Sequence, residues 1–392
     1  MSQLRDDWND DIRSDIGHPD FSELIVYSRD WTVDTIITQL RQGNIDVNPK
    51  FQRRNAWKDS RRSLLIESLI LGIPVPELVL AEDRQAKKKF LVIDGKQRLL
   101  TLAGFIDHDD FGFWNTPKLI DLETRASLNG LDYENLSEQE RRSLMNADVR
   151  CTVISNYSTD DVLYDIFYRL NTGSVPLSTQ ELRQVLKRGD FANYLISTTN
   201  RSHPIQTILK LTGPDARLRD VEILLRYLAF ELGEIEYRGN LKEFLDATME
   251  FGNQKWEGSK KRIAMLDKQV GSAVELGQKL LDDPHRIGRK VLQGKYQSRF
   301  NKAVFEVQIY YFCRLIEEGK GADQIRPKAI KAFQEAHLAL WESDEFIRAV
   351  EVTTKSLDQY RTRFTLFEKM INSVFGLDLD NAKRLFPEDG HA

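Results

Sequence analysis

Apolar residues in the first half of the chain recur with two different spacings. Within residues 32–40 and 59–70 they lie three and four positions apart, which predicts two amphipathic helices. Residues 149–153 alternate between apolar and polar positions, a pattern typical of a half-buried strand. The apolar runs at residues 78–80 and 90–93 flank a charged turn and predict a β-hairpin. This half therefore predicts a mixed domain of helices and strands.

The pattern changes after about Lys187, where helical spacing dominates and strand-like runs nearly vanish. Six segments show the helical spacing: residues 221–232, 241–251, 263–281, 300–316, 330–340 and 346–374. The change predicts an α+β domain at residues 20–187, followed by an all-α domain at residues 188–392. Within the first domain, the polar segment 111–147 is expected to be an insertion rich in short helices.

A capping box marks one helix start near the end of the first domain. Ser178 has the position of an N-cap residue, and Glu181 follows it three positions later. Leu177 and Leu182 have the spacing of a hydrophobic staple around the same helix start. This helix start accounts for Glu181 without any catalytic role.

The composition is that of a globular protein, with 41% hydrophobic and 30% charged residues, and it excludes general disorder. A net charge of −4 gives no bulk positive field, so binding to nucleic acid would need a local basic face. Arg53-Arg54, Arg61-Arg62 and Lys87–Lys89 would provide such a face if they lie together. A solvated charged surface is the simpler alternative.

Two cysteines, Cys151 and Cys313, lie among apolar residues and are expected to be buried free thiols in a reducing compartment. The first residues are polar and acidic, unlike a signal peptide. No apolar run approaches the ~20 residues that a membrane-spanning helix needs. We therefore expect a cytoplasmic protein that does not enter a membrane.

Residues 94–98 read Asp-Gly-Lys-Gln-Arg and separate the apolar run 90–93 from a helix-like stretch at residues 99–105. The layout predicts a strand, a tight polar turn and a helix. Such a turn directs backbone N–H groups and the positive end of the helix dipole at one point, which suits a phosphate group. The motif is therefore the first candidate for a binding site.

Each residue type in this turn fits phosphate chemistry. Gly95 permits close approach of the backbone, and Lys96 and Arg98 add donors and positive charge. Asp94 is suited to holding a metal ion or positioning water. An alternative without a ligand has Asp94 capping the helix and Arg98 in a surface ion pair.

Four segments in one order together resemble the N-terminal half of GmrSD-type modification-dependent restriction enzymes, also called domain of unknown function family two-six-two. The resemblance covers roughly residues 20–190. The segments are Phe51-Gln52-Arg53-Arg54 with Trp57, residues 65–76, the motif at 94–98 with residues 99–102, and residues 167–183.

This resemblance implies a ParB/sulfiredoxin-like fold that binds and hydrolyses a nucleoside triphosphate (GTP, UTP, CTP or ATP) with Mg²⁺. The family motif reads Asp-Gly-Gln-Gln-Arg, and Lys96 replaces its first glutamine here. Lysine donates hydrogen bonds but accepts none, so the departure leaves hydrolysis less secure than binding.

The resemblance also implies roles for individual residues. It assigns catalytic roles to Asp94, Gln97 and Arg98, nucleotide contacts to Arg53, Gly95, Lys96, Arg98, Arg169 and Asn171, and a metal contact to Asp94. For Arg53 a surface ion pair is the alternative, and for Asn171 it is a left-handed cap at the end of a helix. For Glu67 the alternatives are a ligand to metal or water and an exposed residue of an amphipathic helix, of which we expect the second. For Trp57 they are a wall that stacks on a base and a core position, of which we favour the core.

Relatives of this kind often add a C-terminal His-Asn-His nuclease domain, which needs histidines close to acidic or amide side chains. The chain has six histidines, none of which forms a close pair in the sequence. Residues 190–392 carry no nuclease signature, zinc-ligand spacing or Walker-type loop. We therefore interpret the helical half as a sensor or partner-binding domain.

Three hypotheses follow. The first is a nucleotide-dependent restriction or anti-phage defence protein that acts on DNA, with a separate His-Asn-His nuclease or another defence protein as partner and possible oligomerisation. The second is a non-catalytic ParB-like module that binds DNA or protein. The third, a DNA nuclease in its own right, is disfavoured because the carboxylates are not visibly clustered.

Overall fold

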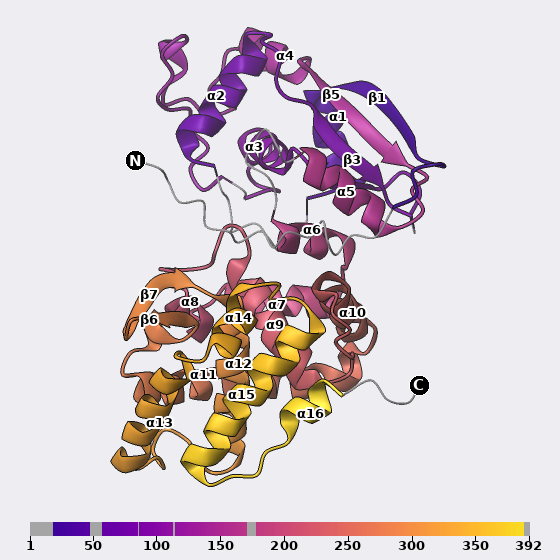
Figure 1. Cartoon of the computed structure of the whole chain (residues 1–392). Helices are drawn as coiled ribbons and strands as arrows, with labels where there is room; N and C mark the ends of the chain where they lie inside the picture. The colour runs from indigo at the N-terminus through magenta and orange to yellow at the C-terminus, as the bar shows by residue number, and fades with distance from the viewer. Residues whose placement is uncertain (1–18, 48–56, 85, 113, 171–177, 388–392) are drawn as a thin grey trace. The chain divides into compact units, whose positions relative to one another are not determined.

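The computed structural model describes residues 19–47, 57–84, 86–112, 114–170 and 178–387, and the chain divides into two compact units (Figure 1). Unit 1 comprises residues 1–186, and unit 2 comprises residues 187–392. Unit 1 contains a sheet with helices, whereas unit 2 consists mainly of helices. The α+β class predicted from the sequence is thereby confirmed.

Unit 1 is built on a five-stranded mixed sheet in the order β1-β5-β3-β4-β2. β1 pairs antiparallel with β5, β3 pairs antiparallel with β4, and the pairs β3–β5 and β2–β4 are parallel. Its elements are β1 (Ile25–Thr32), α1 (Val33–Arg41), β2 (Ile45–Asp46), α2 (Asp59–Ile70), β3 (Leu78–Glu82), β4 (Phe90–Asp94), α3 (Lys96–Ile106), η3 (Ala126–Leu128), α4 (Glu138–Met145), β5 (Asp148–Ser155), α5 (Asp160–Leu170) and α6 (Thr179–Leu186).

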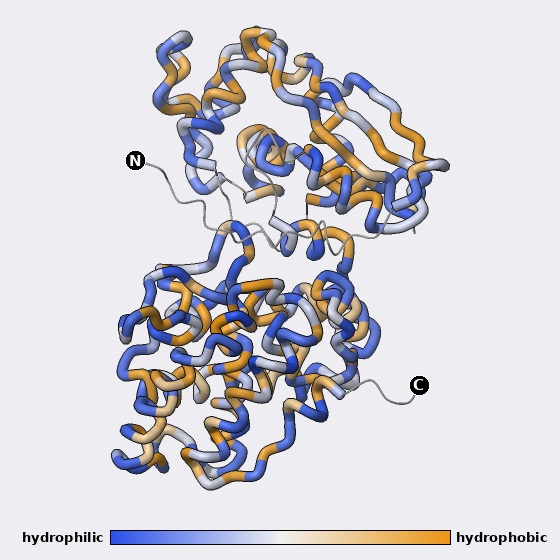
Figure 2. Tube along the Cα trace, in the orientation of Figure 1, coloured by the Kyte–Doolittle hydropathy of each residue, from blue (hydrophilic) through white to orange (hydrophobic). Residues whose placement is uncertain are grey.

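Both faces of the central strands are buried, which explains why β3 and β4 read as continuous apolar runs. Leu80 and Val92 belong to a core shared with α1, α2 and α3. Ala81 and Ile93, one residue further along each strand, belong to a second core shared with α5 and α6. β5 buries mainly one face, as its alternating sequence predicts. Figure 2 shows the apolar segments along this sheet.

The predicted local elements of unit 1 are confirmed. The two amphipathic helices are α1 and α2, and the hairpin is β3–β4. The backbone N–H of Ser178 donates to the Glu181 carboxylate at 2.6 Å, and the N–H of Glu181 donates to Ser178 Oγ at 3.1 Å, so the capping box is present. Leu177, the expected staple partner of Leu182, lies outside the described residues.

Unit 2 packs its helices around α9 and α12, most of whose side chains are buried. Its elements are α7 (Asp190–Thr199), α8 (Pro204–Ile208), α9 (Arg219–Leu232), α10 (Leu241–Gln254), α11 (Trp256–Leu281), η4 (Pro284–Arg286), β6 (Arg289–Leu292), β7 (Lys295–Phe300), α12 (Lys302–Glu317), α13 (Pro327–Leu340), α14 (Asp344–Glu351), α15 (Leu357–Phe375) and α16 (Asn381–Leu385). None of the described helices has the length and apolar composition needed to cross a membrane.

The expectation that the second domain is purely helical is wrong in one place, because β6 and β7 form an antiparallel hairpin. Leu292 pairs with Lys295 across a two-residue turn in which Gln293 and Gly294 have φ values of 50° and 73°. Two successive positive φ values are the geometry of the tight hairpin turn that favours glycine at its second position. Phe300 therefore ends a strand and does not begin the helix predicted at residues 300–316.

Candidate functional site

The Asp94–Arg98 motif forms the predicted strand–turn–helix. β4 ends at Asp94, and α3 begins at Lys96. Gly95 between them has a φ of +95°, and a Cβ built there would lie 2.3 Å from Leu78 Cδ2. Only glycine meets both conditions without displacing the Leu78 side chain.

The turn brings Asp94 and Arg98 together. Arg98 Nη2 lies 3.1 Å from Asp94 Oδ2 and donates to the backbone carbonyl of Glu77 at 2.9 Å. The Arg98 side chain is only 10% exposed, whereas the Asp94 side chain is 36% exposed. The alternative proposed from the sequence is thus wrong in two details: Gly95 is the N-cap residue, and Arg98 lies beneath the surface.

Two polar atoms at this turn have no hydrogen-bond partner among the described residues. They are Arg98 Nε, a donor, and Gln97 Oε1, an acceptor. A buried polar atom without a partner costs about 1–3 kcal/mol, so both are suited to contacting a ligand or ordered water. Lys96 is also buried in this first turn of α3. The backbone N–H groups of a first turn have no carbonyl acceptor within their own helix.

Of the other predicted site residues, the structure describes Arg169. Arg169 lies in the last turn of α5, and its Nε donates to Asp165 at 2.7 Å. α5 packs against β4, the strand that leads to the turn. Arg53 and Asn171 lie outside the described residues, so the structure brings together only the residues of the turn itself.

Glu77 is a residue that sequence reasoning missed. Its backbone carbonyl accepts from Arg98, and its carboxylate accepts from Thr152 Oγ1 at 2.8 Å. It therefore connects α3 to the strands β3 and β5. Nothing in the side-chain pattern reveals this role, because the atom that holds Arg98 is a backbone oxygen.

Glu67 was expected to be exposed, and that expectation is wrong. Glu67 is buried, and its Oε1 accepts the backbone N–H of Arg125 at 2.7 Å. Ser63, one turn earlier, accepts the backbone N–H of Ile120 at 2.9 Å. The insertion at residues 111–147 thus covers the polar side of α2, and Glu67 stabilises that cover.

The basic clusters do not all provide surface charge. Arg62 is buried, its Cζ lies 5.3 Å from the ring centroid of Trp114, and burial lowers the pKa of its guanidinium. Arg61 lies 4.5 Å from the ring centroid of Trp57. Lys87–Lys89 are exposed at the β3–β4 turn. Arg62 is therefore excluded from the DNA-binding face considered from the sequence.

No group of three or more His, Cys, Asp or Glu side chains suited to a metal ion occurs in the part of the chain that the structure describes. Asp94 therefore belongs to no such group among the described residues. Mg²⁺ usually binds through one or two carboxylates together with substrate phosphates and water. The donor set at the turn fits Mg²⁺ only in the company of a phosphate ligand.

The cysteines are both buried and free, as expected. Burial among apolar neighbours raises the pKa of Cys151 to about 12 and raises that of Cys313 further. Neither thiol therefore has the thiolate character of a nucleophile.

Comparison with known families identifies the segment that contains the turn. Residues 33–186 match the family model described as GmrSD restriction endonuclease, N-terminal domain. This segment is similar to the N-terminal domain of GmrSD-type enzymes. The match confirms the resemblance inferred from the four motifs, and it ends at the last residue of α6. No curated protein and no solved structure matches the chain significantly.

The GmrSD-type domain contains all the described candidate residues, from Asp94 to Arg169, whereas unit 2 lies beyond the match. The family assignment therefore concerns unit 1, and unit 2 must be interpreted from its own structure.

Proposed function

We propose that this protein is a nucleotide-dependent component of a DNA-restriction or anti-phage defence system. In this proposal the GmrSD-type domain has a ParB/sulfiredoxin-like fold and binds and hydrolyses a nucleoside triphosphate. The name of the matching family, a restriction endonuclease, supports the restriction part. The protein would then act on DNA in the cytoplasm, together with a separate nuclease.

The geometry of the Gly95 turn is the observation that carries the nucleotide part. Its left-handed glycine lets α3 begin directly after β4, so the positive end of the helix dipole lies at the turn. Arg98 Nε is a buried donor without a partner among the described residues, and the Asp94 carboxylate beside it is partly exposed. Donors and a carboxylate in one place suit a triphosphate accompanied by a cation.

The proposed roles follow from these positions. Lys96 and Arg98 would hold phosphate oxygens, and Asp94 would hold Mg²⁺ directly or through water. When bound, Mg²⁺ would neutralise the negative charge that develops on the phosphates. Gln97 Oε1 would accept a hydrogen bond from the attacking water, which orients that water. Arg53, Arg169 and Asn171 would complete the contacts to the nucleotide.

Phosphate release from GTP, UTP, CTP and ATP, each with and without DNA, tests this proposal. We expect one nucleotide to be turned over with Mg²⁺ and the rate to fall by about 100-fold or more in Asp94→Asn, because the metal and water contacts are lost. Arg98→Lys should raise KM, because lysine lacks the second donor. Glu138→Gln, which breaks an exposed ion pair with Arg142, is the matched control.

Lys96→Gln sharpens the test because it restores the family pattern. A higher rate in this variant would show that lysine limits water positioning, and a higher KM would show that lysine holds phosphate. Unchanged turnover in both Asp94→Asn and Arg98→Lys would remove the proposed site.

A second candidate function is a non-catalytic module that binds DNA or protein. It is favoured by the contacts of Arg98, because Nη2 already bonds to Glu77 and Asp94 within the fold. DNA binding that is independent of nucleotide, with steep dependence on salt, would support this function. Metal-dependent DNA cleavage by the isolated chain would instead support the third hypothesis, a nuclease.

A further inference from the structure

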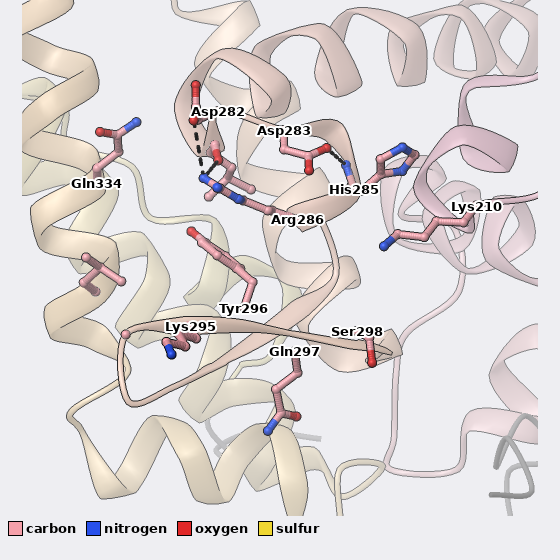
Figure 3. Close-up of a pocket in the computed structure, with 13 residues that line it drawn as sticks. Lys210, Asp282, Asp283, His285, Arg286, Lys295, Tyr296, Gln297, Ser298 and Gln334 are labelled. Carbon is pink, nitrogen blue, oxygen red and sulfur yellow. Dashed lines mark hydrogen bonds and ion pairs between the residues drawn. The ribbon is translucent and has the colours of Figure 1, made fainter. Parts of the chain in front are cut away.

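A cavity of about 870 Å³ lies in unit 2 between η4, the β6–β7 hairpin and α13 (Figure 3). We call it the hairpin cleft. Its polar lining includes Lys210, His285, Arg286, Lys295, Tyr296 and Gln334. The volume falls within the range of about 300–1,000 Å³ that is usual for sites of small ligands.

The acidic side chains of the hairpin cleft are already engaged. Asp283 Oδ1 accepts the backbone N–H of His285 at 2.8 Å. Asp282 Oδ2 lies 3.7 Å from Arg286 Nη1, which also donates to the carbonyl of Leu281 at 2.7 Å. Figure 3 shows Arg286 crossing the cleft toward Asp282, near Tyr296. Counting formal charges, the lining has three cationic side chains (Lys210, Arg286 and Lys295) and two carboxylates (Asp282 and Asp283), a surplus of one positive charge.

Lys210 and Lys295, which lie on different segments of the cleft wall, have no ion-pair partner among the described residues. Figure 3 shows the Lys210 ammonium group reaching into the space beside His285. His285 Nδ1 lies 2.9 Å from the carbonyl oxygen of Thr207, so this ring nitrogen carries the proton in that bond. The cleft thus combines two free ammonium groups with a fixed imidazole.

Arg289 of β6 is a buried cation on which the charge of the cleft residue Asp283 acts. Arg289 is only 3% exposed, and no carboxylate lies within ion-pairing distance of its guanidinium in the described chain. It donates to the carbonyl of Ile208 at 3.0 Å and lies 4.9 Å from the ring centroid of Phe300. Burial lowers its pKa to about 10, and the charge of Asp283, a residue of the cleft, opposes that shift. An anion in the cleft would offset the cost of this buried charge.

We infer that the hairpin cleft binds the phosphate group of a nucleoside phosphate, either as a free nucleotide or within a nucleic-acid strand. Phosphate carries up to two negative charges and accepts several hydrogen bonds, which matches Lys210, Lys295 and the donors of Ser298 and Gln334. This surplus of positive charge is local, because the whole chain has a net charge of −4. The inference goes beyond the function proposed for unit 1 and does not depend on it.

The test uses the full chain and hydrogen exchange at residues 289–300, because protection there reports on the cleft alone. The probes are ATP, inorganic triphosphate and a fluorescein-labelled single-stranded DNA of twelve nucleotides, each also titrated for affinity. The variant Lys210→Gln/Lys295→Gln removes both free ammonium groups. Its matched control is Lys369→Gln/Lys383→Gln, which removes two exposed lysines of α15 and α16.

We expect at least one phosphate probe to protect the hairpin and to bind about tenfold more weakly to the cleft variant, with the control within about twofold of the original chain. If DNA is the ligand, the slope of log affinity against log salt should become shallower by about 1.4 in the cleft variant. Protection by ATP alone would identify a free nucleotide, and protection by DNA alone would identify a strand.

Three results would overturn the inference. They are an absence of protection by every probe, equal weakening in the cleft variant and its control, and stronger protection by citrate than by triphosphate. Arg98→Lys separates this site from the one proposed in unit 1. That variant should leave protection of the hairpin unchanged even where it alters nucleotide turnover.

Discussion

Two clusters of charged residues, one in each unit, use the same chemical groups in opposite ways. In unit 1, Arg98 pairs with Asp94, whose side chain is 36% exposed. In unit 2, Glu306 pairs with Arg226 and Arg363, and the side chains of all three are at most 3% exposed. The first cluster is open to solvent on one side, whereas the second is closed.

The hydrogen bonds alone do not separate the two clusters. Glu306 Oε1 accepts from Arg226 at 2.8 Å, and Oε2 accepts from both Arg363 and the Tyr360 hydroxyl at 2.9 Å. Arg98 Nε and Arg363 Nε both lack a partner among the described residues, so the two clusters differ in their exposure and not in their unpaired donors. A fully buried cluster stabilises the fold and is out of reach of a ligand, whereas the partly exposed Asp94 carboxylate can be reached. We therefore place the candidate chemistry at the turn of unit 1.

The largest effect expected from this comparison is on the stability of unit 2. Glu306→Gln keeps nearly the same shape but removes the carboxylate charge that pairs with the buried Arg363, whereas Arg226 keeps its second partner, Glu222. Breaking a buried ion pair from one side usually costs about 3–5 kcal/mol. We expect a loss of this size, measured by urea unfolding and by faster hydrogen exchange in α9, α12 and α15.

Glu138→Gln is the matched control, because it breaks a pair with Arg142 that is largely exposed. Exposed pairs contribute at most about 1 kcal/mol, so this variant should unfold almost as the original chain does. Similar losses in the two variants would show that the closed network does not behave as a buried one.

The second effect is on the pH dependence of the free energy of unfolding, and it arises from the buried imidazole of His337. His337 is buried against Tyr296 and Phe333, and burial lowers the pKa of its imidazole to about 4. Its Nε2 accepts from Trp341 Nε1 at 3.3 Å, which favours the neutral ring. The unfolded chain takes up a proton below about pH 6.5, whereas the folded chain resists protonation until about pH 4.

The free energy of unfolding should therefore fall as the pH falls from about 6.5 to 4, by up to about 3 kcal/mol from this residue. Urea unfolding at several pH values checks the slope. Because carboxylates also titrate in this range, the informative quantity is the difference between the original chain and His337→Gln, which should be flatter. Parallel slopes would contradict the assignment.

The sequence was sufficient to predict elements defined by local patterns, and insufficient where contacts come from distant segments. Periodicity located α1 and α2, and the Asp94–Arg98 motif located the turn. Burial of Glu67 could not be predicted from α2 alone, because the covering group is a backbone N–H near residue 125. The hydrogen bond from Arg98 to Glu77 could not be predicted from the sequence either, because its acceptor is a backbone oxygen.

The β6–β7 hairpin was missed for another reason. Its residues 289–300 are rich in Lys and Arg and lack a clear alternation, so the helical pattern of their neighbours dominated the prediction. The positive φ values of Gln293 and Gly294 fit a Gln-Gly turn that a search for hairpin signals would have found. The hairpin cleft could not be inferred without this hairpin.

The smallest effect is expected from the packing of the turn in unit 1. Two variants, Gly95→Ala and Gly72→Ala, measure it through the free energy of unfolding. Gly95 and Gly72 both have positive φ values, +95° and +70°. A Cβ on Gly95 would lie 2.3 Å from Leu78 Cδ2, whereas a Cβ on Gly72 would meet nothing within 4 Å among the described residues. Both substitutions by alanine share the conformational cost of about 1–2 kcal/mol and the same entropic gain in the unfolded chain. Only Gly95→Ala adds overpacking.

We therefore expect Gly95→Ala to lower the free energy of unfolding by about 1–3 kcal/mol more than Gly72→Ala does. Urea unfolding of both variants measures this difference, and hydrogen exchange at residues 90–106 assigns it to the turn. If nucleotide also binds here, Gly95→Ala should weaken that binding, because relief of the clash with Leu78 moves the first turn of α3 relative to β4. If the free energy of unfolding falls equally in the two variants, Leu78 of β3 moves aside at little cost. The close approach of β3 would then not explain why glycine stands between Asp94 and Lys96.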